Sequence, residues 1–140
     1  MDATPLDSPT TTVTVEVINW YDRERAARNE IAVDAVRSVT IEALLKPSAT
    51  HFGLPRDVVE RLGLPKVDDV FVRTPSGIVP AGLHSADVRF EDRTWMVSCV
   101  ALPVGTVPVL GRIPMAVLGI EVDPADGSVR VLDKDSYVRI

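Results

Sequence analysis

Few side chains in this sequence have the type and spacing that chemistry requires, and several of them fall between Lys46 and His51. Lys46 and Ser48 could be imagined as a nucleophile pair in which a lysine amine takes the proton of a serine hydroxyl. The two residues flank Pro47 on a predicted turn, and this spacing defines no geometry in which the amine meets the hydroxyl. We therefore predict no Ser-Lys catalytic pair here.

The two histidines and the glycines do not indicate a ligand site. His51 and His84 would need a carboxylate partner to hold a metal ion, and their spacing matches no known metal motif. Gly77, Gly105 and Gly111 form no phosphate loop, because no glycine-rich turn ends in Lys-Ser or Lys-Thr before a helix. We predict surface or turn histidines, structural glycines, no metal and no cofactor.

Cys99 is the only cysteine, so neither an internal disulfide nor a cysteine-based zinc site can form. It lies between Val97 and Val100, whereas reactive thiols need a polar, electropositive setting. This surrounding predicts a buried structural thiol and not a nucleophile.

Composition limits the class of protein. A chain of 140 residues that is 46% hydrophobic fits one globular domain with a real core. The net charge is -5, and acidic and basic residues are interleaved without a basic block, which argues against nucleic-acid binding. No stretch approaches the ~18 apolar residues of a membrane span, and the N-terminus lacks a basic region before an apolar core. We expect a cytoplasmic protein without membrane contact.

The chain divides into three parts. Residues 1–12 are predicted to be a flexible tail, residues 13–132 a barrel domain, and residues 133–140 a C-terminal tail or dimer-interface strand. Val13 to Val17 alternate apolar and polar side chains, which is typical of a half-buried strand. The charged segment from Trp20 to Glu30 is predicted to be a solvated hairpin loop.

The next elements lead into and out of the segment that contains Lys46. Alternating apolar residues from Val39 to Leu45 predict a strand that delivers Lys46 at its end. A short helix is predicted after Pro55, with Asp57 in its first turn and Gly63 at its end. Val58, Val59 and Leu62 are its predicted buried side.

Two hairpins and a short helix follow. Thr74-Pro75-Ser76-Gly77 fits a type I turn between strands at Val70–Val72 and Ile78–Leu83. A second hairpin is predicted around Glu91-Asp92-Arg93, with Trp95 and Val97 pointing inward. The remaining predicted elements are a strand at Pro108–Gly111, helical turns at Pro114–Leu118 and strands at Ile120–Val122 and Val129–Val131. The pattern is all-β with one or two short helices.

These motifs together resemble the retropepsin-like (clan AA) aspartic proteases of the bacterial type. Residues 54–64, Leu-Pro-Arg-Asp-Val-Val-Glu-Arg-Leu-Gly-Leu, look like the segment after the catalytic loop of that family. Residues 109–123 look like its second signature, an apolar pair and a glycine leading into a helix, and Thr74–Gly77 occupies the place of the flap tip. The resemblance implies a closed β-barrel of about six strands that works as a homodimer, with one aspartate from each subunit.

The resemblance also implies a degenerate active site. The family places Asp-Thr-Gly where this chain has Lys46, Pro47 and Ser48. Two close carboxylates share one proton and activate water, whereas a charged lysine has donors and no acceptor. Pro47 lacks the threonine hydroxyl and an amide hydrogen, and Ser48 replaces a glycine that lets the backbone approach closely. We therefore predict no catalytic residues and no aspartic protease activity.

The predicted function is that of an inactive, protease-like homodimer that binds a peptide or protein segment by strand addition under the Val70–His84 hairpin. The predicted peptide-binding residues are Ala49, Thr50, Thr74, Pro75, Ser76, Gly77 and Ile78. Two alternatives remain. One is a structural homo-oligomer assembled through terminal strands that contain Val13–Val17, Val129, Val131 and Val138. The other is an aspartic-type peptidase with an unorthodox site.

Overall fold

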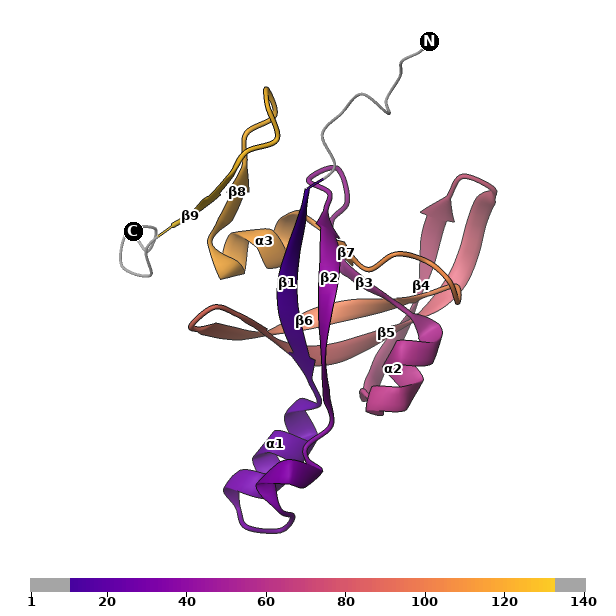
Figure 1. Ribbon diagram of the computed structural model, residues 1–140. Helices are drawn as coiled ribbons and strands as arrows, with labels where there is room; N and C mark the ends of the chain where they lie inside the picture. The colour runs from indigo at the N-terminus through magenta and orange to yellow at the C-terminus, as the bar shows by residue number, and fades with distance from the viewer. Residues whose placement is uncertain (1–10, 133–140) are drawn as a thin grey trace, which may run out of the picture.

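The computed structural model describes residues 11–132 (Figure 1). The elements in chain order are β1 (Thr12–Ile18), α1 (Trp20–Ala27), the 3-10 helix η2 (Val33–Ala35), β2 (Ser38–Leu45), β3 (Phe52–Pro55), α2 (Arg56–Leu62), β4 (Lys66–Thr74), β5 (Gly77–Phe90), β6 (Arg93–Leu102), β7 (Val109–Leu110), α3 (Arg112–Leu118), β8 (Ile120–Val122) and β9 (Val129–Val131). Within this part of the chain no helix is long and apolar enough to cross a membrane.

The main sheet closes on itself. Its seven strands run in the order β1-β2-β7-β3-β6-β5-β4, and β1 also pairs with β5. That extra pairing makes a ring of every strand except β4, which continues outward from β5, while β8 and β9 form a separate hairpin (Figure 1). The predicted closed, all-β barrel is therefore confirmed.

The apolar alternation read from the sequence fills this barrel. Val15 and Val17 of β1 are buried, as are Ala43 and Leu45 of β2. All four residues of β3 are buried because this short strand lies between β7 and β6. Each fully buried aliphatic or aromatic side chain of this kind contributes about 1.5–3 kcal/mol.

The segments around α2 and the two hairpins also follow the prediction. Pro55 precedes α2, and Gly63 ends it in the left-handed conformation with φ +63°. Thr74 pairs with Gly77 across a tight turn. The strands predicted at Ile78–Leu83 and Asp87–Phe90 are one continuous strand, β5.

The segment from Trp20 to Glu30 was predicted wrongly as a hairpin loop, since its first part is helix α1. The Asn19 side chain caps this helix by accepting a hydrogen bond from the Asp22 amide at 2.9 Å. The same side chain donates to the carbonyl oxygens of Leu62, at 2.8 Å, and Gly63. This tertiary contact, which the local charge pattern does not reveal, holds the helix against the end of α2.

Trp95 was also predicted wrongly, because its side chain is 48% exposed, although Val97 is buried as expected. Trp95 is opposite Val88 in the β5–β6 ladder and close to the Glu91–Asp92 turn. The end of this hairpin projects beyond the barrel (Figure 1). The alternation of apolar and polar residues in β6 therefore extends beyond the part of the strand whose inner face is covered by other elements.

The predicted terminal parts lie mostly outside the described residues. β1 includes Thr12, which the sequence places in the tail. Residues 1–10 and 133–140, with Val138, are not described.

Two buried aspartates join α1 to its neighbours with opposite electrostatic results. Asp22 accepts three hydrogen bonds from Arg37, at 2.8 to 3.1 Å, and the Arg37 side chain holds the pKa of Asp22 below its ordinary value. Asp87 lies 2.7 Å from the Arg23 guanidinium, off the direction of a hydrogen bond. Burial raises the pKa of Asp87, and the Arg23 charge only partly opposes this.

These aspartates give a matched prediction. Asp22→Asn should lower the free energy of unfolding by about 2 kcal/mol at pH 7, because Arg37 loses a charged acceptor. A carboxyl with a lowered pKa stabilises the fold above its unfolded pKa near 3.8, and that contribution disappears as the pH falls through the folded value. The cost of Asp22→Asn should therefore shrink near pH 3 in urea unfolding.

The control is Asp87→Asn, which removes a carboxylate whose charged form the fold disfavours. It should change the free energy of unfolding at pH 7 by less than about 0.5 kcal/mol or increase it. Equal losses in the two variants, or a loss in Asp22→Asn that does not depend on pH, would contradict this account.

Candidate functional site

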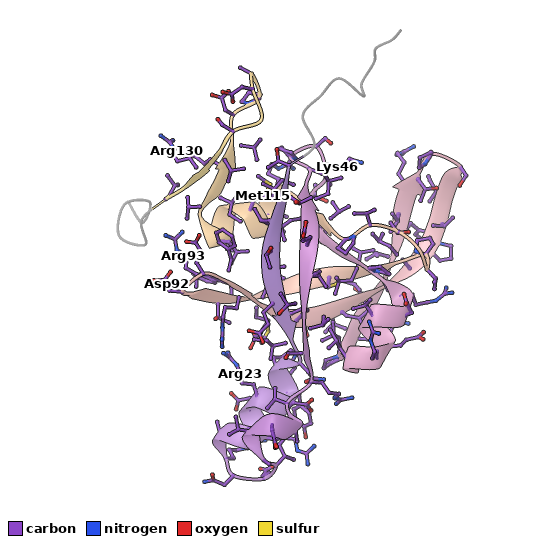
Figure 2. The ribbon with its side chains drawn as sticks, in the orientation of Figure 1. Arg23, Lys46, Asp92, Arg93, Met115 and Arg130 are labelled. Atoms are coloured by element: carbon purple, nitrogen blue, oxygen red, sulfur yellow. The ribbon has the colours of Figure 1, made fainter. Side chains whose placement is uncertain are left out.

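The loop after β2 carries the triplet Lys46-Pro47-Ser48. Lys46 donates its amide to the Leu110 carbonyl at 3.0 Å and accepts the Ala49 amide at 2.9 Å. These bonds fold the triplet into a turn at the end of β2, beside β7. Lys46 is exposed there (Figure 2).

The rest of the loop is fastened to the start of α3. The amides of Gly111, Arg112 and Ile113 donate to the carbonyls of His51, Ala49 and Thr50, at 3.0, 2.8 and 3.0 Å respectively. These are amides that an α-helix cannot satisfy internally, and no side chain caps α3. The loop therefore caps the helix, and the helix fixes the loop.

Gly111 is required by this close approach. A Cβ atom built on it would lie 2.5 Å from the His51 carbonyl oxygen and 2.8 Å from that of Ala49. Both neighbours are backbone atoms, which cannot move aside without opening the loop. The sequence singled out Gly111 as part of a motif, and the structure supplies the steric reason.

The other end of α3 is held from β6. Arg93 is buried and donates to the Leu118 carbonyl at 2.9 Å, one of the last carbonyls of the helix. Gly119 follows in the left-handed conformation, and a Cβ there would clash with the Arg93 guanidinium. Both ends of α3 are thus fixed, which keeps the loop that it supports in place.

The predicted peptide-binding residues fall into two groups. Ala49 and Thr50 lie in the capping loop, and Thr74–Ile78 forms the tip of the β4–β5 hairpin. The Thr74 hydroxyl donates to the Gly77 carbonyl at 2.7 Å, which closes the tip. The hairpin tip and the end of β2 rise on the same side of the molecule (Figure 1), but no hydrogen bond or ion pair recorded for residues 11–132 joins the two groups.

A pocket beside the triplet was not predicted from the sequence. It is lined by Pro47, by Met115 of α3 and by residues of the β8–β9 hairpin: Glu121, Val122, Asp123, Pro124, Ser128 and Arg130. Figure 2 shows Met115 between Lys46 and Arg130. The signal available in the sequence was the acidic end of the second signature, at residues 121–123.

Both carboxylates of this pocket are already engaged. Arg130 donates through Nε to Glu121 at 3.1 Å, and the pair joins the two strands of the hairpin. Asp123 accepts the Ala125 amide at 2.8 Å within the turn. These carboxylates support the hairpin.

The remaining reactive side chains also have structural roles. His51 Nδ1 is 2.7 Å from the Thr50 hydroxyl, and His84 Nδ1 is 2.9 Å from the Leu64 carbonyl oxygen. Residues 11–132 contain no group of three or more His, Cys, Asp and Glu that could hold a metal ion. Cys99 is buried as predicted, and burial raises the pKa of its thiol to about 12, so it stays protonated.

Comparison with known proteins identifies the fold. The solution structure of Simian Foamy Virus (mac) protease covers 76% of this chain and 92% of its own, with a TM-score of 0.50 and 11% sequence identity. This chain has the retropepsin-like fold. At this identity the likeness carries the fold alone. No protein-family model and no curated protein sequence matches the chain.

The retropepsin-like loop gives a steric prediction. Gly111→Ala should lower the free energy of unfolding by about 2–4 kcal/mol, because its Cβ would push apart the backbone of the capping loop. For a chain of this size that loss lowers the midpoint of thermal unfolding by roughly 10 °C.

Gly53→Ala is the matched control, since the three atoms nearest to its Cβ all belong to the Leu102 side chain and not to backbone, with Cδ1 at 2.6 Å. It should cost at most half as much. If calorimetry found the two variants equally stable, the steric role given to Gly111 would be wrong.

Proposed function

We propose that this chain is a bacterial-type retropepsin module with a degenerate catalytic triplet, which binds an extended peptide or protein segment as a homodimer and does not cleave it. One observation carries the proposal. The capping loop keeps a fastened backbone at the end of β2 and carries Lys46, Pro47 and Ser48, the residues that we match to the Asp-Thr-Gly of that family.

The chemistry of the triplet supports inactivity. Hydrolysis by paired carboxylates needs one group that accepts a proton from water and one that donates a proton to the peptide carbonyl. A lysine ammonium has three donors and no acceptor. The two nearby carboxylates, Glu121 and Asp123, are used within the β8–β9 hairpin and do not replace the missing pair.

The triplet also bears on the homodimer. Two Lys46 ammonium groups about 4 Å apart across a two-fold axis would repel by about 1–4 kcal/mol in effective dielectrics of 80 to 20. Lys46 is exposed, so its long side chain can turn away from such an axis into solvent. A dimer through this face is therefore compatible with the triplet when the two ammonium groups lie apart.

The hydrogen bonds of the loop suggest how a peptide would bind. The carbonyls of Ala49 and Thr50 already accept amides of α3, so these residues would contact a peptide through their side chains. Main-chain pairing would come from the hairpin, where Ile78 exposes 58% of its surface beside the tip. An extended segment would thus add to the hairpin and rest against the loop.

Inactivity can be tested with a mixture of synthetic peptides that covers all residue pairs at a central bond. The wild-type chain should leave every peptide intact at pH 4 and pH 7 by mass spectrometry, because it lacks a carboxylate pair. Cleavage that pepstatin stops would refute the proposed inactivity.

The matched gain-of-function variant is Lys46→Asp, Pro47→Thr and Ser48→Gly combined. It should cleave part of the same mixture in a pepstatin-sensitive manner, because the capping loop already has the required backbone. If this variant folds and dimerises but cuts nothing, the loop does not hold the geometry that we assign to it.

Peptide binding can be tested with a fluorescent library of unstructured decapeptides, measured by anisotropy. A subset should bind the wild-type chain, and Ile78→Lys should weaken those peptides at least about tenfold, since it places a hydrated charge beside the pairing strand. Val33→Lys, at an exposed valine of η2, should bind as wild type does. Absence of binding, or equal binding by the two variants, would contradict the proposal.

A further inference from the structure

The outer edge of β4 is uncovered along its whole length by the other strands of residues 11–132. Within residues 11–132, each of the other six strands has at least two neighbours, whereas β4 pairs only with β5. It stands at the margin of the molecule, away from the barrel (Figure 1). An edge of this kind is a template for another strand.

The register identifies which backbone groups face outward. Thr74 and Gly77 close a two-residue turn, so they form a hydrogen-bonded pair and the pairs alternate from there. Phe71 is opposite Pro80, at a position that needs no hydrogen bond and therefore tolerates proline. The amides and carbonyls of Asp69, Phe71 and Arg73 thus point away from β5.

The two edges of the hairpin differ. Pro80 has no amide hydrogen, so it blunts the edge of β5 that β6 leaves uncovered before Leu83. β4 contains no proline between Lys66 and Thr74. The outer edge of β4 is therefore the one suited to pair with another strand.

The side chains on this edge are complementary to themselves. Asp69, Phe71 and Arg73 alternate onto one face of β4 and are exposed, with Phe71 at 79%. Asp69 has only a surface ion pair with Lys66, and within residues 11–132 no ion pair is recorded for Arg73. An acid, an aromatic ring and a base follow one another at intervals of two residues.

We propose that a second copy of this chain pairs its β4 antiparallel to this edge, with the two-fold axis at Phe71. The two Phe71 rings then lie opposite each other, and each Asp69 lies opposite the Arg73 of the second copy. The outward amides and carbonyls form about six hydrogen bonds across the axis. The Asp69 amide exchanges its local bond to Asp68 for one of these.

The charges select this register. Centring the pairing on Asp69 or on Arg73 would place like charges opposite each other, which is destabilising. Centring it on Val70 or Val72 would place a charge opposite Phe71. Only the Phe71 register aligns both ion pairs, and it gives the isologous contact of a two-fold dimer.

This contact uses neither the triplet loop nor the hairpin tip. It does use the hairpin edge to which an extended segment would add under the proposed function, so a second copy and a peptide would compete for the outer edge of β4. A contact between two strands is small, so association should appear at high micromolar concentration. A chain that also dimerised through the loop face would then form larger assemblies.

The test is a charge exchange measured by sedimentation equilibrium at low salt. Asp69→Arg and Arg73→Asp, each alone, should weaken self-association at least about tenfold, because each places two like-charged pairs at the interface. Mixed one to one, the two variants should associate with each other as strongly as wild type. The double variant should also associate as wild type does.

Asp34→Arg is the matched control, since it makes the same charge change at an exposed position of η2 and should leave association unchanged. Circular dichroism confirms that each variant is folded. The proposal is overturned if wild type does not associate through this edge, if the mixture does not restore association, or if the edge takes up an added decapeptide in place of a second copy.

Discussion

The structure depends on a set of main-chain hydrogen bonds between the loop after β2 and the start of α3. Residues 49–51 give three carbonyls to the first amides of α3, and in return α3 holds the loop at the end of β2. The contact is possible only because Gly111 has no side chain where two carbonyls approach. Arg93 fixes the far end of the same helix. This constraint places Lys46, Pro47 and Ser48 at a defined point of the barrel, and it acts through main-chain atoms that are indifferent to which side chains the triplet carries.

Because main-chain atoms hold the loop, the fold does not depend on which side chains occupy the triplet, whereas the chemistry of the site does. A carboxylate pair needs particular side chains, whereas the loop needs only its backbone and the glycine that receives it. The bonds that fasten the loop come from its main chain, so the barrel carries Lys46, Pro47 and Ser48 at this point without losing any of those bonds. Under the proposed function, an extended segment would add to the β4–β5 hairpin and rest against this loop.

Much of the fold could be predicted from the sequence because its signals are local. Alternation located β1 and β2, and turn residues located the hairpins and the glycines that end α2 and α3, although α3 begins at Arg112 and not at Pro114 as predicted. The failures came from contacts that are distant along the chain. The charged residues of α1 predict a solvated segment unless it is known that Arg37 binds Asp22. Trp95 continues the apolar alternation of β6 at a point where no other element within residues 11–132 covers it. Of the site, the triplet and Gly111 were visible as motifs, but the pocket formed with the β8–β9 hairpin required the tertiary structure.

The amide of Asn19 joins three separate stretches of chain. Its oxygen caps the start of α1, and its nitrogen donates to the carbonyls of Leu62 and Gly63 at the end of α2. A side chain at Gly63 would clash with the Arg37 guanidinium that binds Asp22. Asn19, Arg37 and Gly63 are therefore not independent positions. A lineage could alter any one of them only by passing through an intermediate that loses a cap or gains a clash. Substitutions at these three positions should consequently be correlated among related sequences, whereas the exposed charged residues of α1 should vary independently.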